Sequence, residues 1–151
     1  MHNVVKLGLG VALAAALTST TFAQVRPDRA IKYRQGIMQA QSWNLGFLAT
    51  MVKGEQPYNK DKFLYHATAL EQVSHMAWEG YIPGSDQGAP NRAKPEIWKD
   101  AAKFQQAHEA FEAASLKLVA AAKVGTIDAV KGPFSDVAKT CDNCHDNFRS
   151  K

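Results

Sequence analysis

The chain has 151 residues and a formal net charge of +4, with 18 Lys and Arg against 14 Asp and Glu. Residues of both signs are interspersed, so there is no basic stripe of the kind that nucleic-acid binding requires. The length suits a single domain, and the sequence has no internal repeats.

The first 23 residues have the pattern of a secretory signal peptide. Lys6 supplies the positive charge, an apolar stretch covers residues 7–17, and small residues lead up to a cleavage point after Ala23. A membrane anchor would need about 20 apolar residues, and this stretch is shorter. We therefore expect residues 1–23 to be removed and residues 24–151 to form an exported domain with no membrane segment.

Helical periodicity dominates the rest of the chain, beginning with two segments in its first half. The first is predicted for residues 28–53, with Asp28 as the N-cap and Gly54 as the stop. Its apolar residues recur every seven positions, at Ile31, Met38, Leu45 and Val52. The second is predicted for residues 59–78, and a loop rich in glycine and proline follows over residues 79–94. The second segment keeps the same spacing at Phe63, Leu70 and Ala77.

Two further helices are predicted in the second half of the chain. One begins at Pro95, which suits the first turn of a helix, and ends at Gly125. Its inward positions are Ile97, Ala101, Phe104, His108, Phe111, Ser115, Leu118 and Ala122. The other follows Gly125, with a kink or a fresh start at Pro133. Its inward positions are Ile127, Val130, Phe134, Val137, Cys141, Cys144 and Phe148. Four such helices predict an all-α, antiparallel four-helix bundle.

The last predicted helix carries Cys141-Asp-Asn-Cys144-His145, the Cys-x-x-Cys-His pattern of c-type haem attachment. In that chemistry both thiols add to haem vinyl groups, and the imidazole that follows binds the iron. A zinc ribbon would need a second pair of ligands. A thioredoxin-like dithiol would need a βαβ setting, and a structural disulfide would not explain the adjacent histidine. We therefore predict one covalent haem c on Cys141 and Cys144, with His145 as iron ligand, in a bacterial periplasm.

The position of the Cys-x-x-Cys-His motif indicates where the haem lies and which part of the chain could supply a ligand opposite His145. Cys141 and Cys144 are in phase with the inward positions of their helix, so we expect the haem inside the bundle near the end of that helix. His145 is one position off this face, which leaves its outer nitrogen partly open to solvent. Because only six residues follow His145, a sixth ligand from this chain would have to come from upstream.

Arg34, Gln35 and Met38 of the first helix are the candidates on that side. Arg34 and Gln35 interrupt the apolar spacing, and an inward cation needs an anionic partner. Haem propionates suit arginine through paired hydrogen bonds; the alternative is that Arg34 reaches bulk water. Met38 has three interpretations: an iron ligand in a low-spin electron carrier, an apolar cover over a five-coordinate iron, or ordinary core packing.

Aromatic and basic residues elsewhere complete the candidate set. Trp78 and Tyr81, where the second helix meets the loop, are placed to close the pocket, although aromatic residues are also common in plain cores. His108 is expected in the core or at its edge rather than on the iron. Arg149, four residues after His145, either shapes the proximal side or interacts with the helix dipole.

Together these residues resemble cytochrome c′, the class II c-type cytochromes, over essentially the whole of residues 24–151. The resemblance rests on the haem motif with Arg149 and on four further groups of residues. These are Lys32-Tyr33-Arg34-Gln35, Val52-Lys53-Gly54 with Pro57-Tyr58, Trp78 with Pro83-Gly84, and Pro95-Glu96-Ile97-Trp98. The C-terminal placement of the haem motif, together with the Tyr-Arg-Gln segment, narrows the resemblance to class II.

The resemblance implies a four-helix bundle, often a homodimer through its first two helices, with a high-spin haem whose only protein ligand is His145. Met38 matches the hydrophobic residue that blocks the vacant side. The resemblance also implies that nitric oxide and carbon monoxide bind while dioxygen is disfavoured. Arg34 and Gln35 match residues near the propionates, and Arg149 matches an arginine close to proximal nitric oxide.

The expected function is therefore that of a periplasmic, non-enzymatic haem protein that binds small gases and takes part in electron transfer with a redox partner. Low-spin relatives, resembling cytochrome c556, place a methionine ligand on the first helix near Met38. The alternative is accordingly a six-coordinate electron carrier with His145 and Met38 as axial ligands. No arrangement of residues in the sequence predicts an enzyme.

Overall fold

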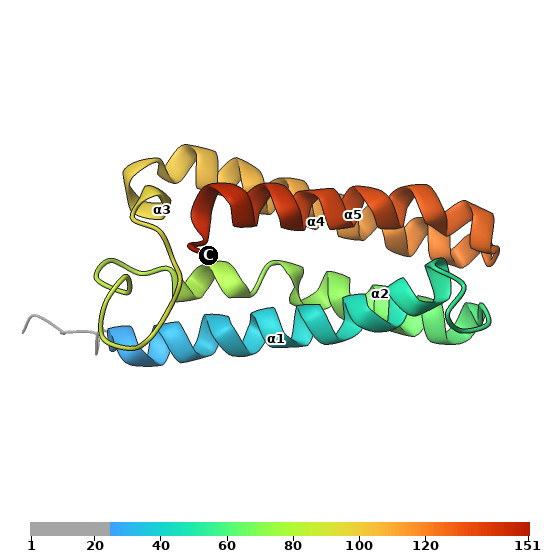
Figure 1. Cartoon of the computed structure of the whole chain (residues 1–151), viewed down its shortest axis with the longest axis horizontal. Coiled ribbons are helices and arrows are strands. Elements are labelled where there is room, and N and C mark those ends of the chain that lie inside the picture. Colours follow the sequence, from blue (N-terminus) through green and yellow to red (C-terminus); the bar gives the residue numbers. More distant parts are fainter. Residues whose placement is uncertain (1–24) are drawn as a thin grey trace, which may run out of the picture.

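The computed structural model describes residues 25–151, which form a four-helix bundle (Figure 1). The long helices are α1 (Pro27–Val52), α2 (Lys60–Ser74), α4 (Ala101–Val124) and α5 (Ile127–Phe148). A 3₁₀ turn, η1 (Ala77–Gly80), and a short helix, α3 (Glu96–Lys99), lie between α2 and α4. The predicted signal peptide, residues 1–23, lies outside the described residues. The predicted all-α bundle is confirmed.

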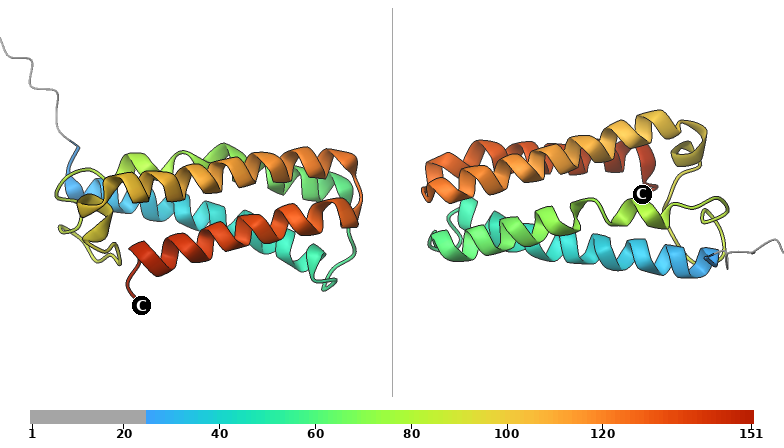
Figure 2. Two further views of the ribbon diagram at one scale, coloured as in Figure 1. Left: turned by 90° about the horizontal axis from the view of Figure 1, so that it is seen from above. Right: turned by 180° about the vertical axis from the view of Figure 1, so that it is seen from behind.

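The helices form two layers, with α1 and α2 in one and α4 and α5 in the other (Figures 1 and 2). Each helix runs antiparallel to the next, because short connections join α1 to α2 and α4 to α5. The long connection between α2 and α4 closes the end of the bundle at which the chain terminates (Figure 2). None of the helices within residues 25–151 is long and apolar enough to cross a membrane.

The ends of α1 and α2 follow local capping chemistry. Arg26 is the N-cap of α1, with Pro27 at its first position, so the predicted cap at Asp28 is wrong. The Asp28 carboxylate lies in the first turn instead, where it accepts hydrogen bonds from the Arg26 guanidinium at 3.0 and 3.1 Å. Asn59 caps α2, since its side-chain oxygen accepts from the backbone N–H of Lys62 at 2.9 Å.

Two predicted helices are shorter than expected. The second ends at Ser74, so Trp78 lies in η1 rather than on α2. The predicted helix from Pro95 is divided at Asp100, whose φ of −124° and ψ of 60° are not helical. The Asp100 carboxylate accepts from the backbone N–H of Lys103 at 3.2 Å and so caps α4. Aspartate favours such a cap over a helix interior, which explains why α3 and α4 are separate.

Helix α5 is continuous through Pro133, so the predicted fresh start is wrong. Proline at that position removes one backbone hydrogen bond. Val130 and Val137, on either side of it, are fully buried. Their packing holds both parts of the helix against α4.

Two groups of buried residues make up the interior. The main core contains Phe63, Leu70, Leu118, Val130 and Val137 among others, from all four long helices. A second group, here called the end cluster, contains Ile97, Phe104 and Phe148. Most of the inward positions predicted for the last three helices are confirmed. On α1 the face is different: Arg34, Gln41, Asn44, Leu48 and Met51 are buried, while Met38, Leu45 and Val52 are half-buried.

Candidate haem site

Cys141 and Cys144 lie one turn apart near the end of α5, both half-buried and neither in a disulfide. Cys141 packs against the main core and Cys144 against the end cluster. Burial, followed by the repulsion that a charged Cys141 would exert, raises the pKa of the Cys144 thiol to about 11. Burial, followed by the negative charge of Asp142, also raises the pKa of Cys141. Both cysteines are therefore thiols at neutral pH, the form whose S–H adds across a vinyl group.

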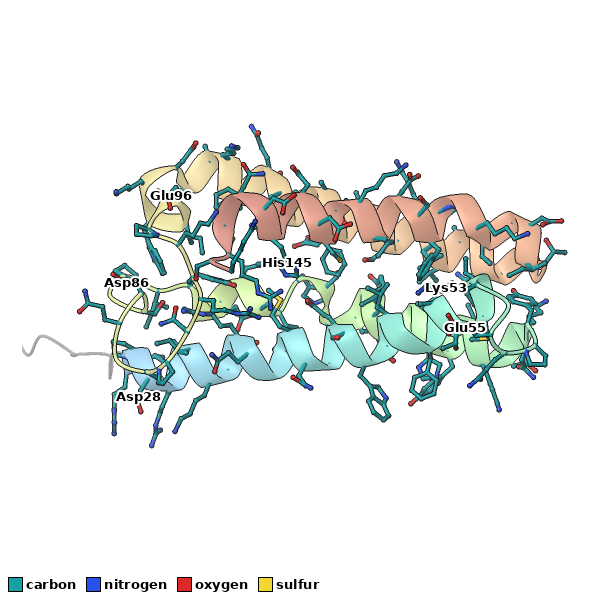
Figure 3. The ribbon with its side chains drawn as sticks, viewed as in Figure 1. Asp28, Lys53, Glu55, Asp86, Glu96 and His145 are labelled. Carbon is teal, nitrogen blue, oxygen red and sulfur yellow. The ribbon has the colours of Figure 1, made fainter. Side chains whose placement is uncertain are left out.

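His145 follows on the same helix, close to the C-terminal end of the chain (Figure 3). Its side chain is exposed, as its position one residue off the buried face predicts. Its backbone oxygen accepts a hydrogen bond from the N–H of Arg149 at 3.0 Å, which closes the last turn of α5. The imidazole is thus held on a regular helix beside both thiols.

The arrangement fits a covalent haem. Two thiols on one helical face lie against two neighbouring hydrophobic groups, which can cover an apolar macrocycle, and one imidazole stands beside them. Haem brings four nitrogen ligands of its own, so one histidine suffices as the protein ligand. Within residues 25–151, no three His, Cys, Asp or Glu side chains gather to hold a metal ion by themselves.

Arg34 is buried, with 3% of its surface exposed, so the alternative in which it reaches bulk water is wrong. Nη1 donates to Gly80 O and to Ser85 Oγ, both at 2.8 Å. Nη2 donates to Ser85 O at 2.7 Å and to Asn91 Oδ1 at 3.2 Å. Burial lowers the pKa of the guanidinium from its usual value. Because both terminal nitrogens donate to loop oxygens, Nε–H is the donor of this side chain that these bonds leave unused.

Gly80 brings η1 unusually close to α1. A Cβ atom added at Gly80 would lie 2.7 Å from Ala30 O and 2.8 Å from Arg34 Cβ. Only glycine permits this approach without a shift of the backbone. The close contact places the Gly80 oxygen within reach of Arg34.

Gln35 is exposed, so the prediction that it fills an inward position beside Arg34 is wrong. Its side-chain nitrogen donates to Pro90 O at 3.0 Å. Gln35 therefore holds the same long loop as Arg34, from the outer side of α1.

Trp78 and Tyr81 lie in the same hydrophobic surroundings as Cys144, and their role in closing a pocket stays a prediction. Both pack against the end cluster together with Cys144. Trp78 stacks on the His108 ring, with centroids 4.7 Å apart. Tyr81 meets Phe104 edge-on at 4.9 Å, and the Arg34 guanidinium lies 4.5 Å above its ring. Burial raises the pKa of Tyr81 to about 12, although the Arg34 charge opposes the shift.

The four-residue spacing of His145 and Arg149 would place both on one face of a continuous helix, but Arg149 lies beyond the helix. Helix α5 ends at Phe148, and Arg149 is extended, with φ of −122° and ψ of 129°. It forms an isolated β-bridge with Ala93. The loop before α3 binds the end of α5 at this point, because Lys94 N donates a hydrogen bond to Phe148 O at 3.0 Å.

Three polar residues of the site were not singled out from the sequence. Ser85 and Asn91 accept hydrogen bonds from Arg34 across more than 50 positions in sequence. No short-range pattern reveals such partners. Glu112 accepts from Trp78 Nε1 at 2.8 Å and from His108 Nδ1 at 3.1 Å. The spacing of His108 and Glu112, four residues apart on one helix, could have indicated that second contact.

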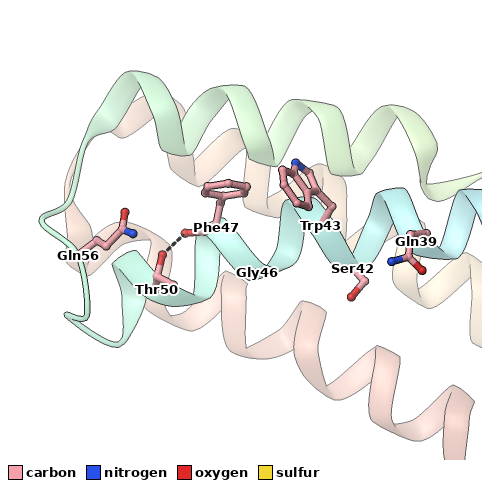
Figure 4. A pocket seen from close by; sticks show the side chains of 7 residues that line it. All are labelled: Gln39, Ser42, Trp43, Gly46, Phe47, Thr50 and Gln56. Atoms are coloured by element: carbon pink, nitrogen blue, oxygen red, sulfur yellow. Dashed lines mark hydrogen bonds between the residues drawn. The ribbon is translucent and has the colours of Figure 1, made fainter.

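Two hollows lie away from this site, along α1, its connection to α2 and the first turns of α2. The first is shown in Figure 4, where Trp43 and Phe47 stand beside small or polar side chains. The second lies around Tyr58 and His66. Neither includes a cysteine or a residue of the end cluster. They belong to the outer surface of the α1–α2 layer rather than to the haem site.

Comparisons with known proteins agree with this arrangement. Residues 29–149 match the model of the family described as Cytochrome C′. Cytochrome c′ of Alcaligenes xylosoxydans xylosoxydans is 36% identical over 126 residues, which are 83% of this chain and 97% of that protein. The 1.3 Å crystal structure of cytochrome c′ from Rubrivivax gelatinosus superposes with a TM-score of 0.80 at 32% identity. That match covers 83% of this chain and 98% of the other.

Ligand complexes are known for one of these similar proteins. Variants of cytochrome c prime from Alcaligenes xylosoxidans have been solved with nitric oxide and with carbon monoxide bound. Both superpose with a TM-score of 0.78 at 36% identity, covering 84% of this chain and 98% of the other. The chain belongs to the cytochrome c′ family, whose members carry a covalent haem c, and Cys141 and Cys144 are its attachment cysteines.

Proposed function

We propose that the chain is a periplasmic haem protein that binds nitric oxide and carbon monoxide at a high-spin, five-coordinate iron. The observation that carries this proposal is that α5 offers a histidine to the iron whereas α1, on the other side of the site, offers none. Helix α5 supplies His145 directly after the cysteines. Helix α1, which packs against α5 from the other layer, has Met38 near Arg34 and contains no histidine. His108 is already engaged by Trp78 and Glu112.

The residues of the chain then have distinct roles. Cys141 and Cys144 hold the haem as thioethers, and His145 binds the iron. Haem supplies the iron that takes a gas molecule in its open position. Met38 covers that position with an apolar side chain, which offers bound dioxygen no hydrogen-bond donor. This favours nitric oxide and carbon monoxide, the ligands found in the Alcaligenes xylosoxidans complexes.

Polar and basic residues complete the site at its edges. Arg34 and Gln35 bind the loop that passes over the end of the bundle, and Nε–H of Arg34 is proposed to face a propionate. Arg149 is exposed directly after α5, on a short segment held by Ala93. In the proposal it contributes positive charge to the proximal side.

The remaining parts of the proposal concern location and partners. Residues 1–23 are proposed to direct export and to be cleaved, leaving residues 24–151 as the working domain. We propose a homodimer through α1 and α2, electron exchange with a redox partner, and no enzymatic reaction. Residues 35–52 of α1, which contain no Asp, Glu, Lys or Arg, support the homodimer.

Absorption spectroscopy of the purified protein tests the state of the iron. Expression with haem-attachment machinery should give a high-spin spectrum in the ferric and ferrous forms, and carbon monoxide should shift the ferrous Soret band. A low-spin spectrum with a methionine–iron charge-transfer band would overturn the proposal. That result would support the alternative, a His145/Met38 electron carrier.

Replacing Met38 with alanine tests the cover over the iron. If Met38 only blocks access, Met38→Ala should speed carbon monoxide association about tenfold, equivalent to about 1.4 kcal/mol in the barrier. Flash photolysis of the ferrous carbon monoxide complex measures that rate. Met76→Ala, which truncates a half-buried methionine outside α1, is the matched control and should leave the rate unchanged. Conversion of a low-spin iron to high-spin would instead identify Met38 as a ligand.

A further inference from the structure

Trp78 has a unique place between the two hydrophobic groups of the bundle. Among the partly buried hydrophobic residues that the structure describes, it alone packs against both the main core and the end cluster. Cys141 touches the first group and Cys144 the second. A haem joined to both cysteines therefore extends along the boundary on which the indole lies.

The backbone gives Trp78 little support of its own. It lies in η1, a 3₁₀ turn of four residues in which Tyr81 N donates to Trp78 O at 3.1 Å. Such turns have poorer hydrogen bonds than an α-helix. The orientation of the half-buried indole consequently depends on contacts made by its side chain.

Helix α4 provides those contacts through Glu112 and His108. One oxygen, Glu112 Oε1, accepts from Trp78 Nε1 at 2.8 Å and from His108 Nδ1 at 3.1 Å. The His108 ring lies on the indole, with an angle of 21° between the planes. The carboxylate thus holds the indole N–H and also the ring that stacks on it. A hydrogen bond to an ionised acceptor is stronger than a neutral one.

We propose that Glu112 is a positioning residue for Trp78: it holds the indole against the haem and so limits the access of gas molecules to the iron. This inference rests on the proposed gas-binding function. Without the carboxylate, the half-buried indole N–H has no acceptor in its present orientation. The ring then turns toward water, and the wall of the pocket loosens.

The test uses the haem-loaded protein and three substitutions on α4. Glu112→Ala removes the acceptor, whereas Glu112→Gln keeps an oxygen in the same place. Glu109→Ala is the matched control, because it removes a carboxylate one turn away that is bonded to Gln105. Carbon monoxide association with the ferrous protein is measured by flash photolysis. The indole N–H resonance of Trp78, assigned by its loss in Trp78→Phe, is read from ¹H–¹⁵N spectra of the diamagnetic carbon monoxide complex.

Glu112→Ala should move the Trp78 N–H resonance upfield and raise the association rate about fivefold, equivalent to about 1 kcal/mol. Glu112→Gln should restore the rate to within about twofold of the wild type. Glu109→Ala should change neither signal. Three results would overturn the proposal: an unmoved resonance in Glu112→Ala, a moved resonance with an unchanged rate, or an equal effect of Glu109→Ala.

Failure of the proposed gas-binding function can be distinguished from failure of the positioning role of Glu112. A wild-type protein that binds no carbon monoxide refutes gas binding, and the gating role of Glu112 with it. Ultraviolet resonance Raman spectra of the ferric variants then report whether Glu112 still holds the indole N–H. Circular dichroism and thermal unfolding of each variant identify any loss that comes from misfolding.

Discussion

Arg34 shows how a single buried charge can organise a loop. Its guanidinium joins α1 to oxygens of Gly80, Ser85 and Asn91, which belong to the connection between α2 and α4. Tyr81 of the same connection stacks beneath it. A buried cation costs desolvation energy unless hydrogen bonds compensate it, and here four do. The residue therefore has a structural role in this chain, whatever contact it also makes with a propionate.

Arg34→Ala should accordingly destabilise the fold. The substitution leaves buried loop oxygens without donors, and a hydrogen bond to a charged group contributes about 1.5–3 kcal/mol net to stability. We expect the free energy of unfolding to fall by about 3 kcal/mol, measured by urea denaturation of the haem-loaded protein. Lys32→Ala, on an exposed position of the same helix, is the control and should change it by less than about 0.5 kcal/mol. Equal effects of the two substitutions would contradict this role.

Tyr81 makes stability depend on pH in the alkaline range. Burial raises the pKa of its phenol to about 12, against an ordinary value of 10.0. The folded state therefore keeps the proton that the unfolded state releases. The stabilising contribution is complete below pH 10 and is lost as pH rises from 10 to 12. A shift of this size corresponds to about 2–3 kcal/mol.

Unfolding free energies measured between pH 9 and pH 12 should show this loss, and phenolate absorbance should report the late ionisation. Tyr81→Phe is the control, because it removes the titrating group and keeps the ring beside Phe104. The variant should show a flatter profile over the same range. An identical profile would assign the loss to other groups, such as Tyr33 or Tyr58, whose pKa values are also raised.

The inward face of α5 was predictable from its sequence. Its inward positions recur in alternating steps of three and four residues, and the buried residues Val130, Val137 and Phe148 follow them. Cys141 and Cys144 continue that face, so the place of the haem motif in the bundle followed from periodicity alone. The spacing of apolar residues predicted the buried face of α5 because hydrophobic residues of other elements pack against that face.

Helix α1 was less predictable because polar residues occupy part of its buried face. Gln41 and Asn44 are buried and use their amides within the bundle: Gln41 Nε2 donates to Val73 O at 2.9 Å, and Asn44 Nδ2 donates to Ala40 O at 2.9 Å. A hydrophobic repeat cannot reveal positions of this kind, so it selected Met38 and Leu45 instead. The same limit applies to Asp100 and Arg149, whose conformations depend on a cap and on a loop distant in sequence.

The outer face of α1 carries exposed aromatic residues and few charges. Residues 35–52 contain no Asp, Glu, Lys or Arg. Trp43 is 66% exposed and meets Phe47 edge-on at 5.2 Å, and Tyr65 of α2 extends the aromatic surface. Exposed apolar patches of this kind commonly mark protein interfaces.

The glycines of α1 also support an interface on this helix. Gly36 and Gly46 lie inside the helix, where glycine costs about 0.5–1 kcal/mol relative to alanine. A Cβ atom added at either position would meet nothing within 4 Å in this chain. Packing within the monomer therefore does not explain them, whereas the close approach of a second α1 would. The face supports the proposed homodimer through α1 and α2.

Substitutions at Gly46 and Trp43 test this dimer. The first is expected to stabilise the monomer and to weaken the dimer, and the second to weaken the dimer. Gly46→Ala should raise the free energy of unfolding of the dilute monomer by about 0.5–1 kcal/mol, because alanine favours the helix. It should nevertheless weaken the dimer, since the added methyl group obstructs the approach of the partner. Trp43→Glu should raise the dissociation constant at least about tenfold, equivalent to about 1.4 kcal/mol.

Sedimentation velocity over a range of concentrations measures the dissociation constants. Leu116→Glu is the matched control, because Leu116 is a similarly exposed apolar residue on α4, in the opposite layer. A dimer through α1 and α2 requires that this variant assemble like the wild type. If Leu116→Glu weakened assembly as much as Trp43→Glu, the interface would lie elsewhere or would reflect general hydrophobic association. A more stable monomer that dimerises less well, as expected for Gly46→Ala, cannot arise from loss of folding.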